Sequence, residues 1–263
     1  MAGESINSEQ VIVMDYGSML SDSFSYAKDA VWCNAKRWFL LLVCLILFPF
    51  ILGYIVRIYR GTKPAPELEQ WGSMFVDGLK LLCVQLIYAA PVILLIIAAF
   101  LPFFSTLFAS GLFTENTTTM SEAQVEQFFG SHPEILSALG TMIILLALAV
   151  ILAIVIGIFS FIGSVRFART GSIAEGFNFS AILATIRKIG WINYLLALIV
   201  IGVIGMVYGF LMNLVMMIPF IGFIIWFLLY PPFILFGGRY ASLVYDEGER
   251  EVIIQSYLPG QTP

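Results

Sequence analysis

The chain has 263 residues, of which 60% are hydrophobic and 11% are charged, and its formal net charge is −4. Soluble domains carry roughly 45–50% apolar and about 25% charged residues. This composition therefore excludes an ordinary soluble globule and indicates that part of the chain lies in an apolar medium such as a lipid bilayer. The acidic balance, with a pI near 5.0, argues against a nucleic-acid-binding protein, which would carry a basic stripe.

Five apolar stretches predict helices that cross a membrane, because each holds roughly the 20 apolar residues that a bilayer core requires. In chain order they are Trp38–Ile58, Leu81–Phe108, Ile135–Gly163, Trp191–Met217 and Phe220–Tyr240. The sequence therefore predicts an all-α fold, a polytopic transmembrane helical bundle of about five spans with cytoplasmic interfacial amphipathic helices. We expect a polar N-terminal segment over residues 1–27, one transmembrane domain over 28–245 and a polar tail over 246–263.

The charges of the loops predict the orientation in the membrane. Lys and Arg gather between the first and second spans and between the third and fourth, whereas residues 109–134 contain neither. The positive-inside rule places the two basic loops and the C-terminus in the cytoplasm, and residues 109–134 outside the cell. Five spans then put the N-terminus outside. A re-entrant first segment, indicated by Phe48-Pro49-Phe50, is the alternative and returns the N-terminus to the cytoplasm.

The two basic loops begin alike, with Arg57-x-x-Arg60 after the first span and Arg166-x-x-Arg169 after the third. An amphipathic stretch follows each pair, and the spacing of apolar residues predicts a cytoplasmic interfacial helix over Phe179–Ile189. The likeness indicates two loosely repeated units; ordinary positive-inside bias explains it equally well. We expect the four arginines to contact lipid phosphates or a cytoplasmic partner.

The fifth span contains Tyr230-Pro231-Pro232 near its middle. Two prolines remove two backbone donors, so we expect this helix to break at Tyr230, against the second and fourth spans. Exposed backbone at membrane depth can bind a ligand, which makes these three residues a candidate site. A structural kink packed against neighbouring helices is the simpler interpretation.

The fourth span carries Gly205 and Gly209, a pair of small residues four positions apart. Such a pair lets two helices approach closely. Packing within the chain is the simpler interpretation, and a homodimer through this face is the alternative.

Catalytic and cofactor chemistry finds little support in the sequence. His132 is the one histidine, and the three cysteines show no metal-ligand spacing. No phosphate-binding glycine loop is present, and no charged residue lies deep within a span. We therefore expect no enzyme activity, no cofactor and no metal.

A set of residues in the two basic loops stands out as a pattern: Gly53-Tyr54-x-x-Arg57-x-x-Arg60, Pro66-Glu67, Trp71-Gly72 and Phe75-Val76-Asp77-Gly78, followed in the second loop by Arg169-x-Gly171 and Phe177. This pattern resembles a mainly archaeal family of multi-pass membrane proteins of unknown function, domain of unknown function 4013. The resemblance covers about residues 27–245 and implies an archaeal cell membrane. It implies no activity.

These observations favour a non-enzymatic membrane scaffold or accessory subunit, whose basic cytoplasmic loops lie at the lipid headgroups. Membrane lipids, a second copy of the chain or another membrane protein are the expected partners. The alternative is a passive transporter or channel with its site at the broken fifth span. A continuous polar cavity reaching the two prolines would favour transport, and a dry packed bundle would favour a scaffold.

Overall fold

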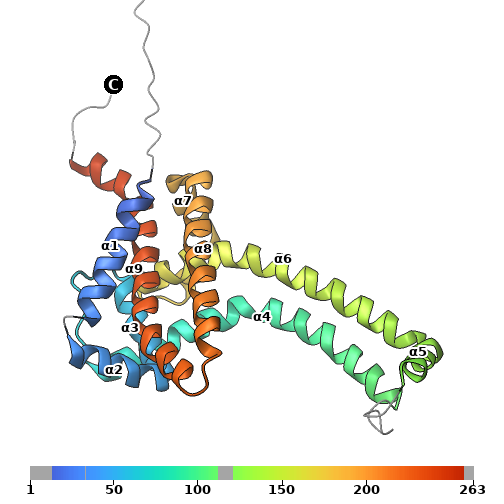
Figure 1. The fold of residues 1–263 in the computed structure, drawn as a ribbon. Coiled ribbons are helices and arrows are strands. Elements are labelled where there is room, and N and C mark those ends of the chain that lie inside the picture. The colour runs from blue at the N-terminus through green and yellow to red at the C-terminus, as the bar shows by residue number, and fades with distance from the viewer. Residues whose placement is uncertain (1–13, 33, 112–120, 258–263) are drawn as a thin grey trace, which may run out of the picture. The chain divides into compact units, whose positions relative to one another are not determined.

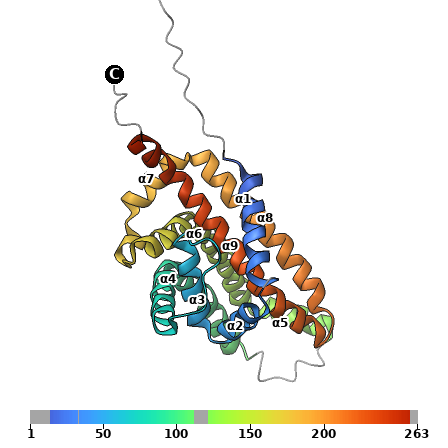
Figure 2. The ribbon, with the colours of Figure 1, turned by 90° about the vertical axis from the view of Figure 1, so that its left-hand side faces the viewer.

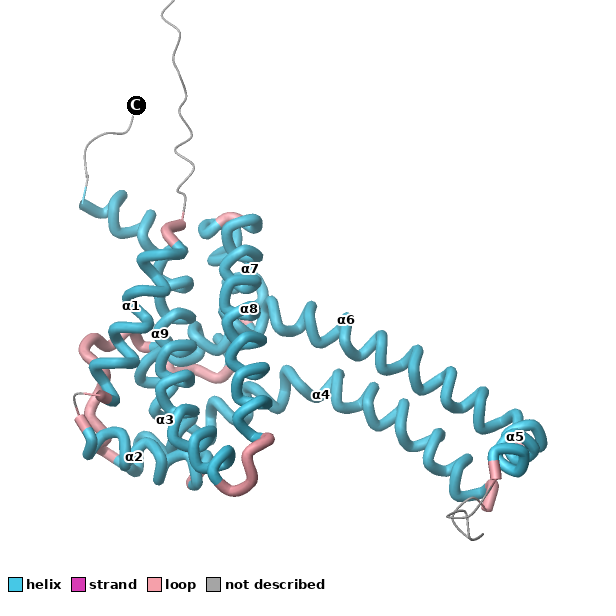
Figure 3. Tube along the Cα trace, in the orientation of Figure 1, coloured by secondary structure: helices cyan, strands magenta, loops and turns pink. Residues whose placement is uncertain are grey.

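The computed structural model describes residues 14–32, 34–111 and 121–257, and this part is built from helices and loops (Figures 1 and 3). Its elements are α1 (Tyr16–Val31), α2 (Ala35–Ile46), α3 (Phe48–Tyr59), α4 (Trp71–Ala109), α5 (Glu122–Ser131), α6 (Pro133–Thr170), the 3-10 helix η2 (Ala174–Phe177), α7 (Phe179–Ile189), α8 (Trp191–Met216) and α9 (Ile221–Tyr257). The predicted all-α class is confirmed.

Four of these helices are long and apolar enough to cross a membrane. They are α4, α6, α8 and residues Ile221–Glu249 of α9. The chain is thus an integral membrane protein by the length and composition of its helices. The prediction of about five spans was one too many, and the difference lies in the first apolar stretch.

The stretch Trp38–Ile58 is not one spanning helix. It is divided between α2 and α3, of 12 residues each, which meet at Leu47 with φ −93° and ψ 74°. Pro49 lies in the first turn of α3, where a proline is tolerated because the missing N–H has no helical acceptor there. Each helix rises about 18 Å, less than the roughly 30 Å of a hydrocarbon core.

The described chain forms two compact units. Among the described residues, the first comprises 14–32, 34–82 and 161–257, and the second comprises 83–111 and 121–160. The second unit is a helical hairpin in which α4 leads through α5 into α6. The outward side chains of this hairpin are mostly apolar, Leu94, Leu101 and Ile144 among them, as expected of helices that face lipid.

In the first unit α9 is the central helix, and α1, α2, α3, α7 and α8 pack on it. Figures 1 and 2 both show α1 lying along α9. Two ion pairs fasten α1: Asp22 binds Arg239 of α9 at 2.7 Å, and it also binds Lys63. The side chains of Tyr26, Tyr54 and Leu235 are buried in the core that these helices share.

The contact between α3 and the start of α4 is very close. A Cβ on Gly53 would lie 1.7 Å from the carbonyl oxygen of Met74, and a Cβ on Gly78 would lie 1.8 Å from that of Pro49. Only glycine fits at these two positions. The close contact places the first-loop residues against the start of α4.

Candidate functional site

The first arginine of the first loop ties the loop to itself. Arg57 donates from its guanidinium to the carbonyl oxygens of Glu67 at 3.1 Å and Gln70 at 3.2 Å, and to the Ser73 hydroxyl at 3.3 Å. The segment that joins α3 to α4 has no regular secondary structure, so a side chain donates the hydrogen bonds that its backbone carbonyls would otherwise receive from a helix or sheet.

The second arginines of the two loops bind each other's helix. Arg60 donates from Nε to the carbonyl oxygen of Ala168 at 3.1 Å, and Arg169 donates from Nε to that of Tyr59 at 2.5 Å. Each acceptor directly precedes the other arginine in sequence, so the arrangement has a local twofold character. The last carbonyls of a helix have no helical donor, and a cation suits that end of the helix dipole. We call Arg60, Arg169 and these two carbonyls the reciprocal arginine clasp.

Carboxylates complete the clasp on both sides. Arg60 forms an ion pair with Asp77 at 2.8 Å. Arg169 pairs with Asp246 at 2.5 Å, and it also donates to the Ser242 hydroxyl at 2.9 Å. The Arg169 side chain is 23% exposed and that of Arg60 is 38% exposed, so the Arg169 half of the clasp is the better shielded from water.

Glycines give the clasp its space. Gly61, directly after Arg60, has φ +82°, and a Cβ there would lie 3.0 Å from Nη2 of Arg169. Gly171, two residues after Arg169, has φ +71°. Both loops thus leave their helix through a left-handed glycine, a common way to end a helix.

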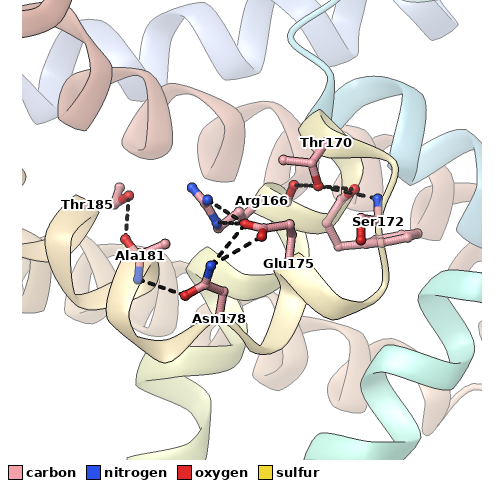
Figure 4. A network of polar contacts seen from close by, with 8 residues as sticks. Arg166, Thr170, Ser172, Glu175, Asn178, Ala181 and Thr185 are labelled. Carbon is pink, nitrogen blue, oxygen red and sulfur yellow. Dashed lines mark hydrogen bonds and ion pairs between the residues drawn. The ribbon is translucent and has the colours of Figure 1, made fainter.

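Arg166 organises the second loop (Figure 4). It donates to one carboxylate oxygen of Glu175 from Nε at 2.9 Å and from Nη2 at 2.5 Å. Hydrogen bonds from Arg166 and Asn178 hold the pKa of Glu175 below its usual range. The Asn178 side chain in turn accepts from the Ala181 N–H at 3.2 Å and caps α7.

The helix α7 has the predicted bounds, Phe179–Ile189. Its apolar stripe, with Ile182 and Ile186 fully buried, packs on α8 and α9, while Arg187 and Lys188 point to the outside. The predicted amphipathic helix is confirmed, and the protein itself supplies the apolar partner. Its position at the membrane interface stays a prediction.

Of the four predicted arginines, the structure brings Arg60 and Arg169 together and places Arg57 and Arg166 in separate networks. All four donate to groups of the protein. The sequence does not reveal Asp77 and Asp246 as the partners of Arg60 and Arg169, because these carboxylates lie 17 and 77 residues away from the arginines they bind. Asn178 was detectable, since it directly precedes the first residue of the apolar stripe.

The prediction of a broken fifth span was wrong. The helix α9 continues from Ile221 to Tyr257 with Pro231 and Pro232 inside it. A proline at position 232 leaves the carbonyl of Leu228 without its helical donor, and the indole Nε1 of Trp38 donates to that oxygen at 3.1 Å. A side chain from α2 thus replaces the backbone bond that Pro232 cannot make.

Of the two expected neighbours of the proline segment, the fourth span is confirmed, because α8 packs on α9. Pro231 is buried and Pro232 is half-buried. Both lie in the part of the first unit where α1, α2, α3 and α8 pack on α9. An apolar groove of about 710 Å³ lies beside Pro232, between α1, α8 and α9. The ring of Tyr208 stacks on Phe233 in its wall, with the centroids 3.9 Å apart.

The small-residue pair of α8 has no partner helix in the described part of the chain. A Cβ added at Gly205 or Gly209 would meet no atom within 4 Å. Within these residues the pair therefore does not serve a close helix contact. The alternative, a homodimer through this face of α8, stays a prediction.

The family profile described as "Protein of unknown function (DUF4013)" matches residues 38–217 of the chain. No curated protein and no solved structure matches. The matched region begins at Trp38 and contains both arginine loops, the Gly53 and Gly78 contact and the spans α4, α6 and α8. Because it covers more than half of the chain, the protein belongs to the DUF4013 family of proteins of unknown function.

Proposed function

We propose that the protein is a non-enzymatic scaffold or accessory subunit of a membrane complex. The observation that carries the proposal is the reciprocal arginine clasp, in which Arg60 and Arg169 each bind the carbonyl before the other arginine. In the clasp the guanidinium groups of Arg60 and Arg169 hold the two loops to each other. Such a use favours a rigid platform over a reactive or mobile site.

The acidic groups nearby support the same proposal. Asp22, Asp77, Glu175 and Asp246 each accept from an arginine at 2.5–2.8 Å. Burial acts against ionisation of Asp22, but hydrogen bonds from Arg239 and Lys63 lower the pKa of this carboxyl, and hydrogen bonds from Arg166 and Asn178 lower that of Glu175. These two carboxylates are therefore poor general acids at neutral pH.

Four spans give the platform an orientation. With an even number of crossings, both chain ends lie on the same side of the membrane as the two basic loops. The positive-inside rule assigns that side to the cytoplasm. Residues 109–134 then lie outside the cell, and α7 and the clasp face the cytoplasm near the lipid headgroups. The archaeal source implied by the first-loop resemblance stays a prediction.

Co-purification in mild detergent after chemical crosslinking tests the proposal. We expect a partner at fixed stoichiometry with the wild-type protein and its loss from the Arg60→Ala/Arg169→Ala variant. Arg187→Ala, which removes an exposed arginine of α7, is the matched control and keeps the partner. The proposal fails if no partner is found at fixed stoichiometry, or if the control loses it equally.

The alternative, a passive transporter or channel at the proline segment, is tested with the same preparation. Proteoliposomes that contain the wild-type protein would then pass ions or small solutes faster than protein-free vesicles, and Pro232→Ala would change the rate. The apolar walls of the groove beside Pro232 favour hydrocarbon over a polar solute, which is why transport ranks second.

A further inference from the structure

The groove between α1, α8 and α9 is open to the medium around two membrane spans. Val203 and Val207 of α8 and Phe233 and Phe236 of α9 form its walls, and the two valines are 46% and 53% exposed. Since α8 and α9 are both candidate spans, the medium at these walls is lipid hydrocarbon. A groove of about 710 Å³ with such walls accepts a flexible chain rather than a flat polar molecule.

One charged side chain lines the groove, and it is a cation. Lys28 of α1 is exposed, and its ammonium forms no ion pair or hydrogen bond with the described residues. A lysine that lies along an apolar wall keeps its charged end toward a polar layer. That layer is near, because Asp22, bound to Arg239 and Lys63, lies six residues away on α1, or about 9 Å along the helix.

A second polar group of the groove also lacks a partner. The hydroxyl of Tyr208 is buried and has no hydrogen-bond partner in the described part of the chain. A buried hydroxyl without a partner costs free energy until an acceptor reaches it. The groove therefore offers a cation, a hydroxyl donor and apolar walls to one occupant.

We infer that this groove binds an anionic membrane lipid, with a hydrocarbon chain between α1, α8 and α9 and its acidic headgroup at Lys28. The lipid oxygens nearest the chain supply the acceptor for Tyr208. The inference deepens the proposed function by naming a lipid partner, and it rests on that function only for the membrane position of α8 and α9. All of α1 and all of α9 lie outside the region matched by the family profile, so the site is assigned to this chain and not to the family.

Native mass spectrometry of the detergent-purified chain tests the inference with phosphatidylglycerol and phosphatidylcholine of identical acyl chains. We expect one firmly held phosphatidylglycerol per chain. Lys28→Gln should weaken its retention about fivefold and leave phosphatidylcholine unchanged, since one lysine near an anionic group is worth about that factor. Lys36→Gln, which removes an exposed lysine outside the groove, should change neither lipid.

Filling the groove provides the second arm. Val207→Trp should lower the retention of both lipids, whereas Met206→Trp, at a 69% exposed position of α8 outside the groove, should not. Val203→Trp repeats the test if Val207→Trp does not give a monodisperse protein. Equal retention of the two lipids by the wild type overturns the inference, as does equal loss in Lys28→Gln and Lys36→Gln. A dimer that Val207→Trp dissociates assigns the groove to a second copy instead. None of these readings depends on the co-purified partner, so either proposal can fail alone.

Discussion

Trp38 and Leu228 lie 190 residues apart in sequence and are joined by a hydrogen bond of 3.1 Å from the indole Nε1 to the backbone carbonyl. That carbonyl is the acceptor that Pro232 cannot serve. The proline and the tryptophan therefore act as one unit: the first removes a donor from α9, and the second returns it from α2.

Replacing the tryptophan should expose this dependence. We expect Trp38→Phe to lower the free energy of unfolding by about 1–3 kcal/mol, because it leaves a polar group unsatisfied. In a Pro232→Ala background, where residue 232 again donates within the helix, the same change should cost clearly less. Thermal unfolding of the four proteins in one detergent measures the difference. An equal cost in both backgrounds would show that the hydrogen bond is not the cause.

The glycines between α3 and α4 lead to a second prediction. Gly78→Ala should lower stability by about 1–3 kcal/mol, since the new methyl group would overlap the carbonyl of Pro49. Gly72→Ala is the matched control, because a Cβ there meets nothing within 4 Å. The control should be neutral or slightly stabilising in the same unfolding assay. Similar losses in both variants would rule out the overlap as the reason.

The two halves of the clasp should differ in strength. We expect Arg169→Ala to cost about 2–3 kcal/mol, because it removes several charge-assisted bonds from a poorly exposed site. Arg60→Ala should cost about 1 kcal/mol, since its ion pair is more open to water. Arg187→Ala, on the exposed face of α7, should stay within about 0.5 kcal/mol of the wild type. The opposite ranking of the two clasp arginines would contradict this account.

The pairing of Glu175 with Arg166 predicts a dependence on pH. The pKa of Glu175 is lowered in the folded protein, so the stabilisation it provides is present at neutral pH and is lost as the pH falls through the folded-state pKa. The melting temperature of the wild type should therefore fall more steeply than that of Glu175→Gln between about pH 5 and pH 3. Parallel curves for the two proteins would exclude a contribution from this carboxylate.

The proposed topology makes a prediction for intact cells. With the three native cysteines replaced by alanine, a cysteine at Ala123 in α5 should react with an impermeant maleimide, and one at Ser21 in α1 should react only after lysis. Both positions are exposed in the structure. Labelling of Ser21→Cys on intact cells would place the N-terminus outside and would show that the number of crossings is odd.

The four long spans and the helix α7 followed from hydropathy and helical spacing, because both signals are local. The interruption at Leu47 does not follow from hydropathy, which sums side chains and does not register a single non-helical residue; Phe48-Pro49-Phe50 indicates it only as the re-entrant alternative. The sequence predicts a polar segment over residues 1–27 and not the helix α1, because Ser23, Ala27 and Ala30, which the helix buries, are small and weaken the apolar period.

The arginines show the same limit at the candidate site. Their presence at the ends of two helices is visible in the sequence, which predicts contacts with lipid phosphates or a cytoplasmic partner. The acceptors of the clasp lie 108 and 110 residues away from the arginines that bind them, so only the folded chain reveals them. The groove at Lys28 was not foreseen for the same reason, since α1, α8 and α9 each contribute a part of its wall.

The ion pair between Asp22 and Arg239 also sets an order of events during synthesis. Its partners are 217 residues apart, so at roughly 5–20 residues per second the ribosome needs roughly 10–40 s after making Asp22 before Arg239 exists. Throughout that interval α1 has no α9 on which to dock, and the face that carries Met19 and Tyr26 stays uncovered. The core of the first unit therefore closes only after the last span has left the ribosome, and a nascent chain that stalls before α9 presents an undocked amphipathic helix to the chaperones of the cell.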